Sequence, residues 1–238
     1  IDSLKKLENF DFPDDGPLLT LPWKLVSPAI DTSLLGCEKS SPSVLPRALE
    51  KIATYQGTVA IYTDASKVKE KTAIGVYFKT LNVEFARRTP DNISIFTAEI
   101  TAIQTALEII LENAENFQEN AGTNKVTIFT DSLSSISALQ FKNKIHLRTH
   151  ATDVLTLVTE CSKKKIACNL VWVPSHVGIP GNEKADRLAT SAIASPEVQL
   201  KTHVELADIK NFVKNESRQQ WQTNWSIGKD SNFFRRIC

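Results

Sequence analysis

The stretch WVPSHVGIPGNEKADRLA, residues 172–189, carries the clearest structural signal in this sequence. It opens at the end of the β-rich run 166–173, which Pro174 terminates because proline has no backbone N–H to donate. Two glycines and a second proline then indicate a loop, and small apolar residues at helical spacing predict a helix over 182–194. The stretch therefore predicts a strand, a loop and a helix in that order, with Asp186 in the helix.

Hydrophobic periodicity outside this stretch predicts further strands and helices. The strand-like runs are short and rich in β-branched or aromatic residues, and they are 58–63, 73–80, 83–89, 126–130 and 166–173. The helical runs place apolar residues on one face, and they are 97–116, 132–140, 149–163 and 182–194. Three consecutive strands, followed by strands that alternate with helices, predict an α/β fold in which a mixed sheet is covered by helices.

Composition excludes several classes of protein. The 238 residues include 28 Lys and Arg against 27 Asp and Glu, a formal net charge of +1, and 42% are hydrophobic. That apolar fraction excludes a disordered chain, and the balanced charge argues against a basic coat protein. No run approaches the roughly 20 apolar residues of a membrane helix, and the first residues lack the basic-then-apolar order of a signal peptide. We therefore expect no membrane association and no secretion, and an intracellular location in the nucleus or cytoplasm.

The chain divides into three predicted parts. Six prolines predict a proline-rich linker or N-terminal extension over 1–57, and the strand and helix runs form a domain over 58–195. Residues 196–238 are expected to form a C-terminal helical extension, in which Trp221 and Trp225 share the apolar stripe of one helix. These two tryptophans fit core or interface packing, and they also fit base stacking on nucleic acid.

Acidic residues follow two of the predicted strands, Asp64 in TDA and Asp131 in TDS. Side chains at the carboxyl ends of neighbouring strands gather in one crevice, so the two are expected to share a site, although each alone fits a turn or a helix cap. Glu99, in the first turn of its predicted helix, alone fits a helix-dipole contact or a cap, and Asp186 alone fits a solvated face.

Four carboxylates in one crevice repel one another unless cations hold them together. Carboxylate oxygens suit Mg²⁺ or Mn²⁺, and two such ions can hold both the attacking and the leaving oxygen of a phosphodiester. The acidic residues therefore predict metal-dependent hydrolysis of a phosphodiester.

Four segments together resemble the type 1 ribonuclease H domain, and most closely the version in reverse transcriptase polyproteins of non-LTR retrotransposons. They are Thr63-Asp64-Ala65-Ser66, Thr97-Ala98-Glu99-Ile100, Thr130-Asp131-Ser132 and the stretch 172–189. The resemblance covers 58–194 and implies a ribonuclease H-like mixed five-stranded sheet, in the order 3-2-1-4-5, flanked by helices. It implies an endonuclease that hydrolyses the RNA strand of RNA/DNA hybrids with two Mg²⁺ or Mn²⁺ ions.

The same resemblance implies a role for each site residue. Asp64 is expected to bridge both ions, Glu99 and Asp131 to hold one, and Asp186 to hold the other. His176 would assist proton transfer or product release, and the alternative is a surface histidine without a role. Ser66 is expected to contact substrate, and Asn182 to contact substrate or cap its helix.

Two features leave the substrate and the parent protein open. Many cellular relatives have a polar pair just before the catalytic glutamate, where this chain has Ile95 and Phe96, so amide contacts to 2′-hydroxyls are not expected there. The expected partners are an RNA/DNA hybrid and a reverse transcriptase body in the parent polypeptide. The alternative function is a catalytically silent nucleic-acid-binding or interaction module that keeps the fold.

Overall fold

The computed structural model describes residues 24–36, 41–114, 122–140, 149–200, 202 and 204–227. Its strands and helices follow the chain in the order β1 (Ala29–Asp31), α2 (Val44–Ala53), β2 (Val59–Val68), β3 (Lys71–Phe78), β4 (Val83–Thr89), α3 (Ile95–Glu112), β5 (Lys125–Thr130), α5 (Leu133–Gln140), α6 (His150–Lys163), β6 (Ala167–Trp172), α7 (Pro180–Ala192) and α8 (Leu206–Ile227). The expected strand and helix runs are therefore present, with ends shifted by a few residues.

The six strands form one mixed sheet in the order β1-β6-β5-β2-β3-β4. β2, β3 and β4 are antiparallel neighbours, whereas β5 lies parallel to β2, β6 to β5 and β1 to β6. The five expected strands keep the order 3-2-1-4-5, but the prediction of a five-stranded sheet is wrong. The sixth strand, β1, comes from the predicted proline-rich extension, and its three residues are too few to show any periodicity.

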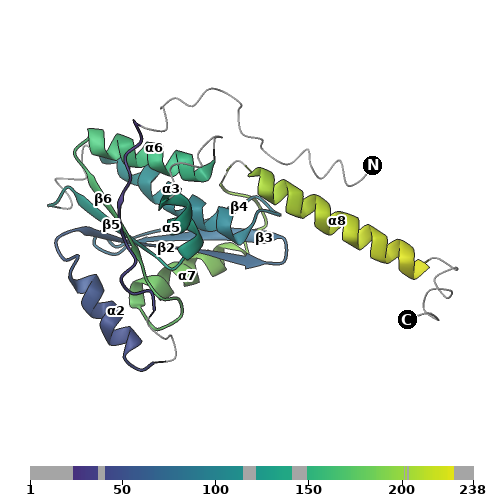
Figure 1. Ribbon diagram of the computed structural model, residues 1–238, viewed down its shortest axis with the longest axis horizontal. Coiled ribbons are helices and arrows are strands. Elements are labelled where there is room, and N and C mark those ends of the chain that lie inside the picture. The colour runs from purple at the N-terminus through teal and green to yellow at the C-terminus, as the bar shows by residue number, and fades with distance from the viewer. Residues whose placement is uncertain are drawn as a thin grey trace.

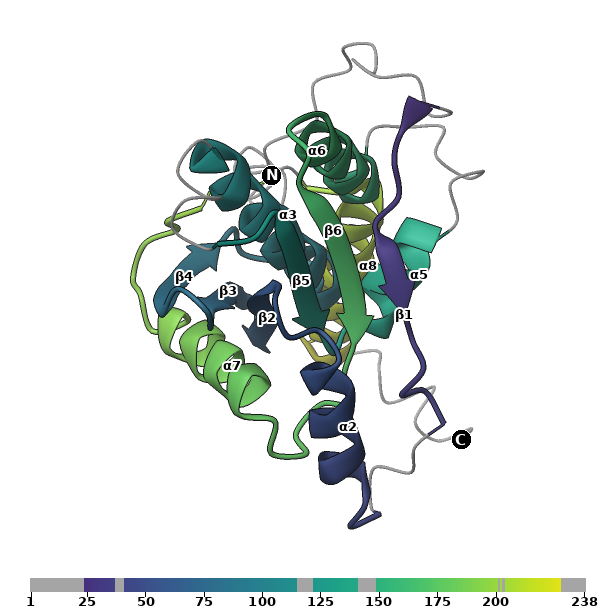
Figure 2. The same ribbon diagram turned by 90° about the vertical axis from the view of Figure 1, so that its left-hand side faces the viewer.

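Helices cover both faces of the sheet (Figures 1 and 2). α3, α5 and α6 lie together on one face, and α7 lies on the other against β2, β3 and β4. Gly75 on β3 lets α7 approach the sheet, because a Cβ at this position would overlap the carbonyl oxygen of Ala185. Gly181, near the start of α7, lies in the same way against the ring of Tyr62. The amino end of α7 is therefore held close to β2.

The register of β2 and β5 places two acidic residues side by side. These strands pair from Val59 with Val126 to Thr63 with Thr130, so Asp64 and Asp131 come next at the same level. The expectation that β2 stops at Asp64 is wrong, because β2 continues to Val68 as half of a hairpin with β3. Only its pairing with β5 ends at Thr63, and the backbone beside Asp64 is open on that side.

Segments before and after the predicted domain take part in the same core. Leu25 and Ala48 precede it, Val204 and Phe212 follow it, and all four are buried with the core residues of the sheet and helices. β1 is fastened to α2, since the Asp31 carboxylate accepts hydrogen bonds from Lys51 Nζ and Tyr55 Oη, both at 2.6 Å. The outer part of α8 projects away from the body (Figure 1).

The boundaries at residues 57 and 195 stay predictions, and residues 1–23 and 228–238 of the two extensions lie outside the described residues. Among the helices of the described ranges, none is long and apolar enough to cross a membrane.

Candidate active site

Three carboxylates from different elements meet where the pairing of β2 with β5 ends. Asp64 lies within β2, Glu99 in the second turn of α3, and Asp131 directly after β5. Each offers an oxygen within 4.8 Å of the others. Asp64 and Glu99 are only 5% and 8% exposed, and Asp131 is half-buried. We call these three residues the buried trio.

Glu99 does not cap its helix. α3 begins at Ile95, two residues earlier than expected, and its N-cap is Ser94, whose hydroxyl accepts a hydrogen bond from the Thr97 backbone N–H. The expectation of a cap or a first-turn dipole contact for Glu99 is therefore wrong. Its side chain is free of that task and faces the two aspartates, and its Oε2 has no hydrogen-bond partner within the described residues.

Burial and nearby negative charges make Asp64 and Glu99 hard to ionise. Burial, followed by the negative charges of Asp131 and Asp186, raises the pKa of Asp64 to about 8, although the hydrogen bond from the Ala65 backbone N–H, at 2.7 Å, acts to lower it. Burial likewise raises the pKa of Glu99 well above its usual range, followed by the charges of Asp64 and Asp131. Neither Asp64 nor Glu99 forms an ion pair with a lysine or arginine in the described part of the chain.

This arrangement fits a divalent cation. The carboxylates offer the hard oxygen ligands that such ions prefer. A bound cation would also neutralise Asp64 and Glu99, which have no counter-charge among the described residues, and would give the buried Glu99 Oε2 a partner. Within the described ranges, no lysine or arginine neutralises Asp64 or Glu99 in place of such a cation.

Asp131 is held in place from α7 and β6. Asn182 Nδ2 donates to Asp131 Oδ2 at 3.1 Å, and Trp172 Nε1 donates to the Asp131 backbone carbonyl at 3.1 Å. Asn182 is the third residue of α7, whose N-cap is Ile179, so the expectation that Asn182 caps the helix is wrong. It is 2% exposed, and its contact with Asp131 is a positioning contact.

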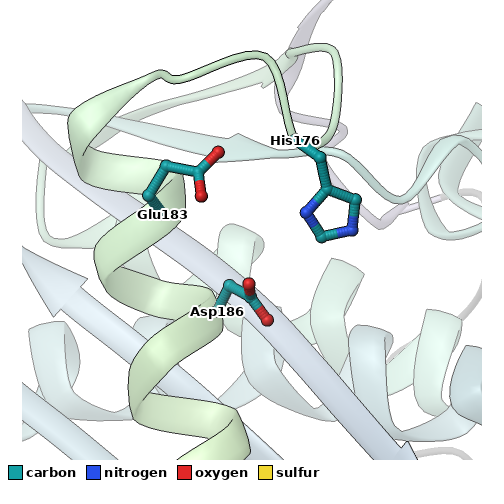
Figure 3. Close-up of side chains that lie close together, drawn as sticks. All are labelled: His176, Glu183 and Asp186. Carbon is teal, nitrogen blue, oxygen red and sulfur yellow. The ribbon is translucent and has the colours of Figure 1, made fainter.

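A second group of side chains lies on α7 and the loop before it. His176, Glu183 and Asp186 offer ligand atoms within 4.8 Å of one another, and their side chains point toward a common space (Figure 3). His176 is exposed, whereas the two carboxylates are half-buried. We call these three residues the α7 group. Since the charge of Asp186 raises the pKa of Asp64, the α7 group and the buried trio border the same site.

The loop of His176 is held by a backbone contact. His176 has a positive φ of 55°, which is uncommon for a residue other than glycine. The Gly178 backbone N–H donates to Glu183 Oε1 at 3.3 Å, so a carboxylate of the helix restrains the loop two residues beyond the histidine. An unusual backbone conformation held by its surroundings is typical of functional positions.

Ser66 reaches the site through a residue of α7. Thr190 Oγ1 lies 3.3 Å from Asp186 Oδ1 and 3.3 Å from Ser66 Oγ, and is placed to donate to either. Ser66 is half-buried and lies two residues past Asp64 on β2, on the same face of the strand. It therefore borders the site near Asp186.

Comparison with protein families identifies the domain. The family model described as RNase H matches residues 56–194, more than half of the chain. This chain belongs to the RNase H family. As a member, it is a hydrolase of the RNA–DNA hybrid ribonuclease class, a family that uses divalent metal ions.

Solved structures of RNase H proteins resemble somewhat more than half of this chain. RNase H1 from the halophilic archaeon Halobacterium salinarum NRC-1 is 19% identical over 57% of this chain and 97% of that chain, with a TM-score of 0.42. LC11-RNase H1, isolated from compost, is 19% identical over 58% of this chain and 96% of its own, with a TM-score of 0.44. A complex of LC11-RNase H1 with an RNA/DNA hybrid is 19% identical over 57% and 96%, with a TM-score of 0.45.

Two residues of this RNase H site did not emerge from the sequence. Glu183 precedes Asp186 by three positions and Thr190 follows it by four, so helical periodicity alone puts both beside Asp186. That spacing was the available signal, but it does not tell which of the neighbouring polar residues faces the site. The structure selects these two through their contacts with Gly178 and Asp186.

Proposed function

We propose that this RNase H domain cleaves the RNA strand of RNA/DNA hybrids endonucleolytically, with two Mg²⁺ or Mn²⁺ ions bound by Asp64, Glu99, Asp131 and Asp186. The observation that carries the proposal is the buried trio, whose oxygens lie within 4.8 Å of one another, together with the charge of Asp186 that acts on Asp64. Such a convergence is costly without cations, and the fold maintains it where the parallel pairing of β2 and β5 ends.

Each carboxylate has a place that suits its role. When bound, the ions would supply activation of a water molecule and stabilisation of the leaving oxygen. Glu99 and Asp131 would hold one ion, and Asp186 on α7 would hold the other. Asp64 belongs to the buried trio and is also under the charge of Asp186, which supports a role shared by both ions.

His176 would move a proton or assist product release at the edge of the site. It is exposed on a loop, and it lies within 4.8 Å of ligand atoms of Glu183 and Asp186. An exposed imidazole can accept a proton from a reacting group and pass it to solvent. Glu183 would keep the loop in position through Gly178.

Substrate contacts are proposed on β2 and α7. Ser66 borders the site and can donate or accept a hydrogen bond to a ribose hydroxyl or a phosphate. Asn182 supports substrate binding indirectly, because its amide holds Asp131. Ile95 is exposed at the amino end of α3 and offers no polar group. Hybrid recognition must therefore come from other residues around the site.

The proposal extends to the origin and location of the protein. The stretch 172–189 supports an origin in a polyprotein of a non-LTR retrotransposon, with a reverse transcriptase body as partner, working in the nucleus or cytoplasm. An antibody against this domain should detect a polypeptide well above 26.5 kDa in extracts of cells that express the element. Detection only in the culture medium would contradict the location.

One assay tests the chemistry. The full chain is incubated with labelled RNA/DNA hybrid, duplex RNA or duplex DNA, in Mg²⁺ or in EDTA. We expect internal cleavage of the hybrid's RNA strand in Mg²⁺ alone, and its loss in Asp131→Asn. Asp153→Asn, the same chemical change in the first turn of α6, is the matched control and should remain active. An inactive wild-type chain that still binds hybrid would establish the silent module instead.

A further inference from the structure

The base of α8 is fixed beside the active site. Asp208 is 1% exposed, and its carboxylate accepts hydrogen bonds from the Ser94 backbone N–H at 2.9 Å and from Thr97 Oγ1 at 2.6 Å. Ser94 is the N-cap of α3, the helix that carries Glu99. Glu205, just before α8, accepts a hydrogen bond from the His150 backbone N–H at 3.1 Å, at the start of α6. α8 therefore begins at a defined place, anchored to the amino ends of two helices.

A groove runs between α8 and the turn that joins β2 to β3. Its volume is about 380 Å³, and its walls come from 67–70, 92–94 and 208–219. Apart from Asp208, whose carboxylate is occupied at α3, the charged residues that line it are four cations and two anions. They are Lys67, Lys69, Lys214, Arg218, Glu70 and Glu216. Within the described residues, Lys69, Lys214 and Arg218 have no ion-pair partner.

The groove lies within reach of a polymer bound at the carboxylates. Lys67 is three residues beyond Asp64 on the same strand, which is about 10 Å along β2. From the other wall, Ser94 is five residues before Glu99, about 8 Å along α3. A small molecule at the carboxylates would not reach the groove, whereas a nucleic acid extends past it on one side.

The outer part of α8 continues the same surface. Lys214, Arg218, Trp221 and Trp225 are separated by four, three and four residues, so they form one stripe along the helix. Trp221 and Trp225 are 61% and 38% exposed, and their rings stack on each other with centroids 5.2 Å apart. These tryptophans are not core residues, so the expectation of core packing is wrong for them, and interface packing or nucleic-acid contact is left.

Cations and exposed aromatic rings on one stripe favour nucleic acid over protein. Lysine and arginine bind phosphates, and flat aromatic rings take up sugars and unpaired bases whatever the sequence. Protein interfaces also use arginine and tryptophan, but they are depleted in lysine, so it is Lys67, Lys69 and Lys214 that favour nucleic acid. We propose that the groove and the stripe of α8 bind the sugar–phosphate backbone of the hybrid on one side of the cleavage site. This inference rests on the proposed function and adds the surface that binds the flanking substrate.

The test measures binding apart from cleavage. In the Asp131→Asn background, where no hydrolysis is expected, Lys214→Gln/Arg218→Gln is compared with its parent by fluorescence anisotropy on a labelled RNA/DNA hybrid of about 20 base pairs, over a series of salt concentrations. The matched control is Lys163→Gln/Lys164→Gln, which removes the same charge at the carboxyl end of α6. Far-UV circular dichroism checks that α8 remains folded.

We expect the groove variant to bind roughly three- to tenfold more weakly at about 0.1 M salt, with the slope of log K against log salt smaller by about 1.5. The control should bind like its parent. Equal dissociation constants and equal slopes for the groove variant and the control would overturn the inference and leave a protein partner as the occupant of this surface.

Failure of the proposed function gives a different result. If the wild-type chain does not cleave hybrid, the anisotropy series still shows whether the groove binds hybrid, since binding is measured without turnover. As a second measurement, Trp221→Ala/Trp225→Ala should weaken binding of a hybrid with a single-stranded overhang by about threefold or more. No change in either double variant would remove the whole stripe from substrate binding.

Discussion

The buried trio and the α7 group use similar residues in opposite surroundings. In the trio, Asp64 and Glu99 are almost fully buried, and burial is the largest cause of their raised pKa values. In the α7 group, His176 is exposed and both carboxylates are half-buried, on a helix and a loop that one backbone contact joins. The first group sits on the sheet and on a helix packed against it, and the second sits at the rim.

The difference in burial between the two groups suits two tasks of the site, which are cation binding and the exchange of protons and products with solvent. Buried oxygens at fixed positions favour tight cation binding, because water does not compete for the ion and the ligands lose little freedom on binding. A rim group with an exposed imidazole suits steps in which protons and products exchange with solvent. We therefore expect substitutions of the trio, and of Asp186 as a proposed cation ligand, to abolish turnover. Substitutions of His176 or Glu183 at the rim should modulate it.

The sharpest test makes the same chemical change in each group. Glu99→Gln should lower kcat by about 10³-fold or more, since it removes a buried cation ligand, whereas Glu183→Gln should lower it by about threefold through its loop contact. Steady-state cleavage of hybrid in Mg²⁺ measures both. Equal losses in the two variants would erase the distinction between a cation group and a rim group.

A second test concerns the imidazole at the rim. His176→Ala should lower kcat by roughly 10²-fold, while the concentration of Mg²⁺ needed for half-maximal rate stays as in wild type. Single-turnover and steady-state rates distinguish proton transfer from product release. A large rise in the Mg²⁺ requirement would instead place His176 among the cation ligands.

A third test concerns Asp208, which lies outside the family match and holds the amino end of α3, the helix that carries Glu99. Asp208→Ala leaves the Ser94 N–H and Thr97 Oγ1 without their acceptor, and should lower the free energy of unfolding by about 1–2 kcal/mol. Thermal unfolding measures the loss. Asp208→Asn keeps one acceptor oxygen and should lose less, so equal losses in both would show that the buried charge is what matters.

A fourth test concerns the pH dependence of stability without metal. Folding raises the pKa of Asp64 to about 8, so from about pH 4 to pH 8 the folded chain holds a proton that the unfolded chain releases. The free energy of unfolding should therefore fall as pH rises through this window.

Asp131→Asn removes one negative charge that raises the pKa of Asp64. The free energy of unfolding of this variant should therefore decrease less as pH rises. At pH 8 in EDTA, the variant should gain about 1.4 kcal/mol over wild type, or about 3 °C in Tm. Asp186→Asn, at the half-buried rim, should gain less. Mg²⁺ should stabilise wild type more at pH 8 than at pH 5. A Tm of wild type that rises toward pH 8 in EDTA would contradict this account.

Hydrophobic patterns along the sequence predicted most of the strands and helices, but they did not predict contacts between residues far apart in the chain. The expected strands and helices were found because hydrophobic periodicity reflects the face that each element buries. The extension of β2 past Asp64 was missed because Ser66 and Lys67 break the apolar pattern, and only the hairpin with β3 explains their pairing. β1 was missed because it has three residues.

The site follows the same rule. The four carboxylates were identified from short motifs, and the structure brings three of them within 4.8 Å while the charge of Asp186 acts on Asp64. The contact of Asn182 with Asp131 spans 51 positions, and that of Asp208 with Ser94 spans 114. A pattern within a window of 18 residues carries no information on such pairs.

The short strand β1 has a consequence for how this domain can be handled. Its residues occupy the outer side of β6 from Asn169 to Val171, and Lys51 and Tyr55 clamp it there through Asp31. A chain trimmed to the family match, 56–194, would leave the backbone N–H and C=O groups of β6 without that cover. Exposed strand borders recruit other chains, so the trimmed protein should form soluble aggregates that the longer chain avoids.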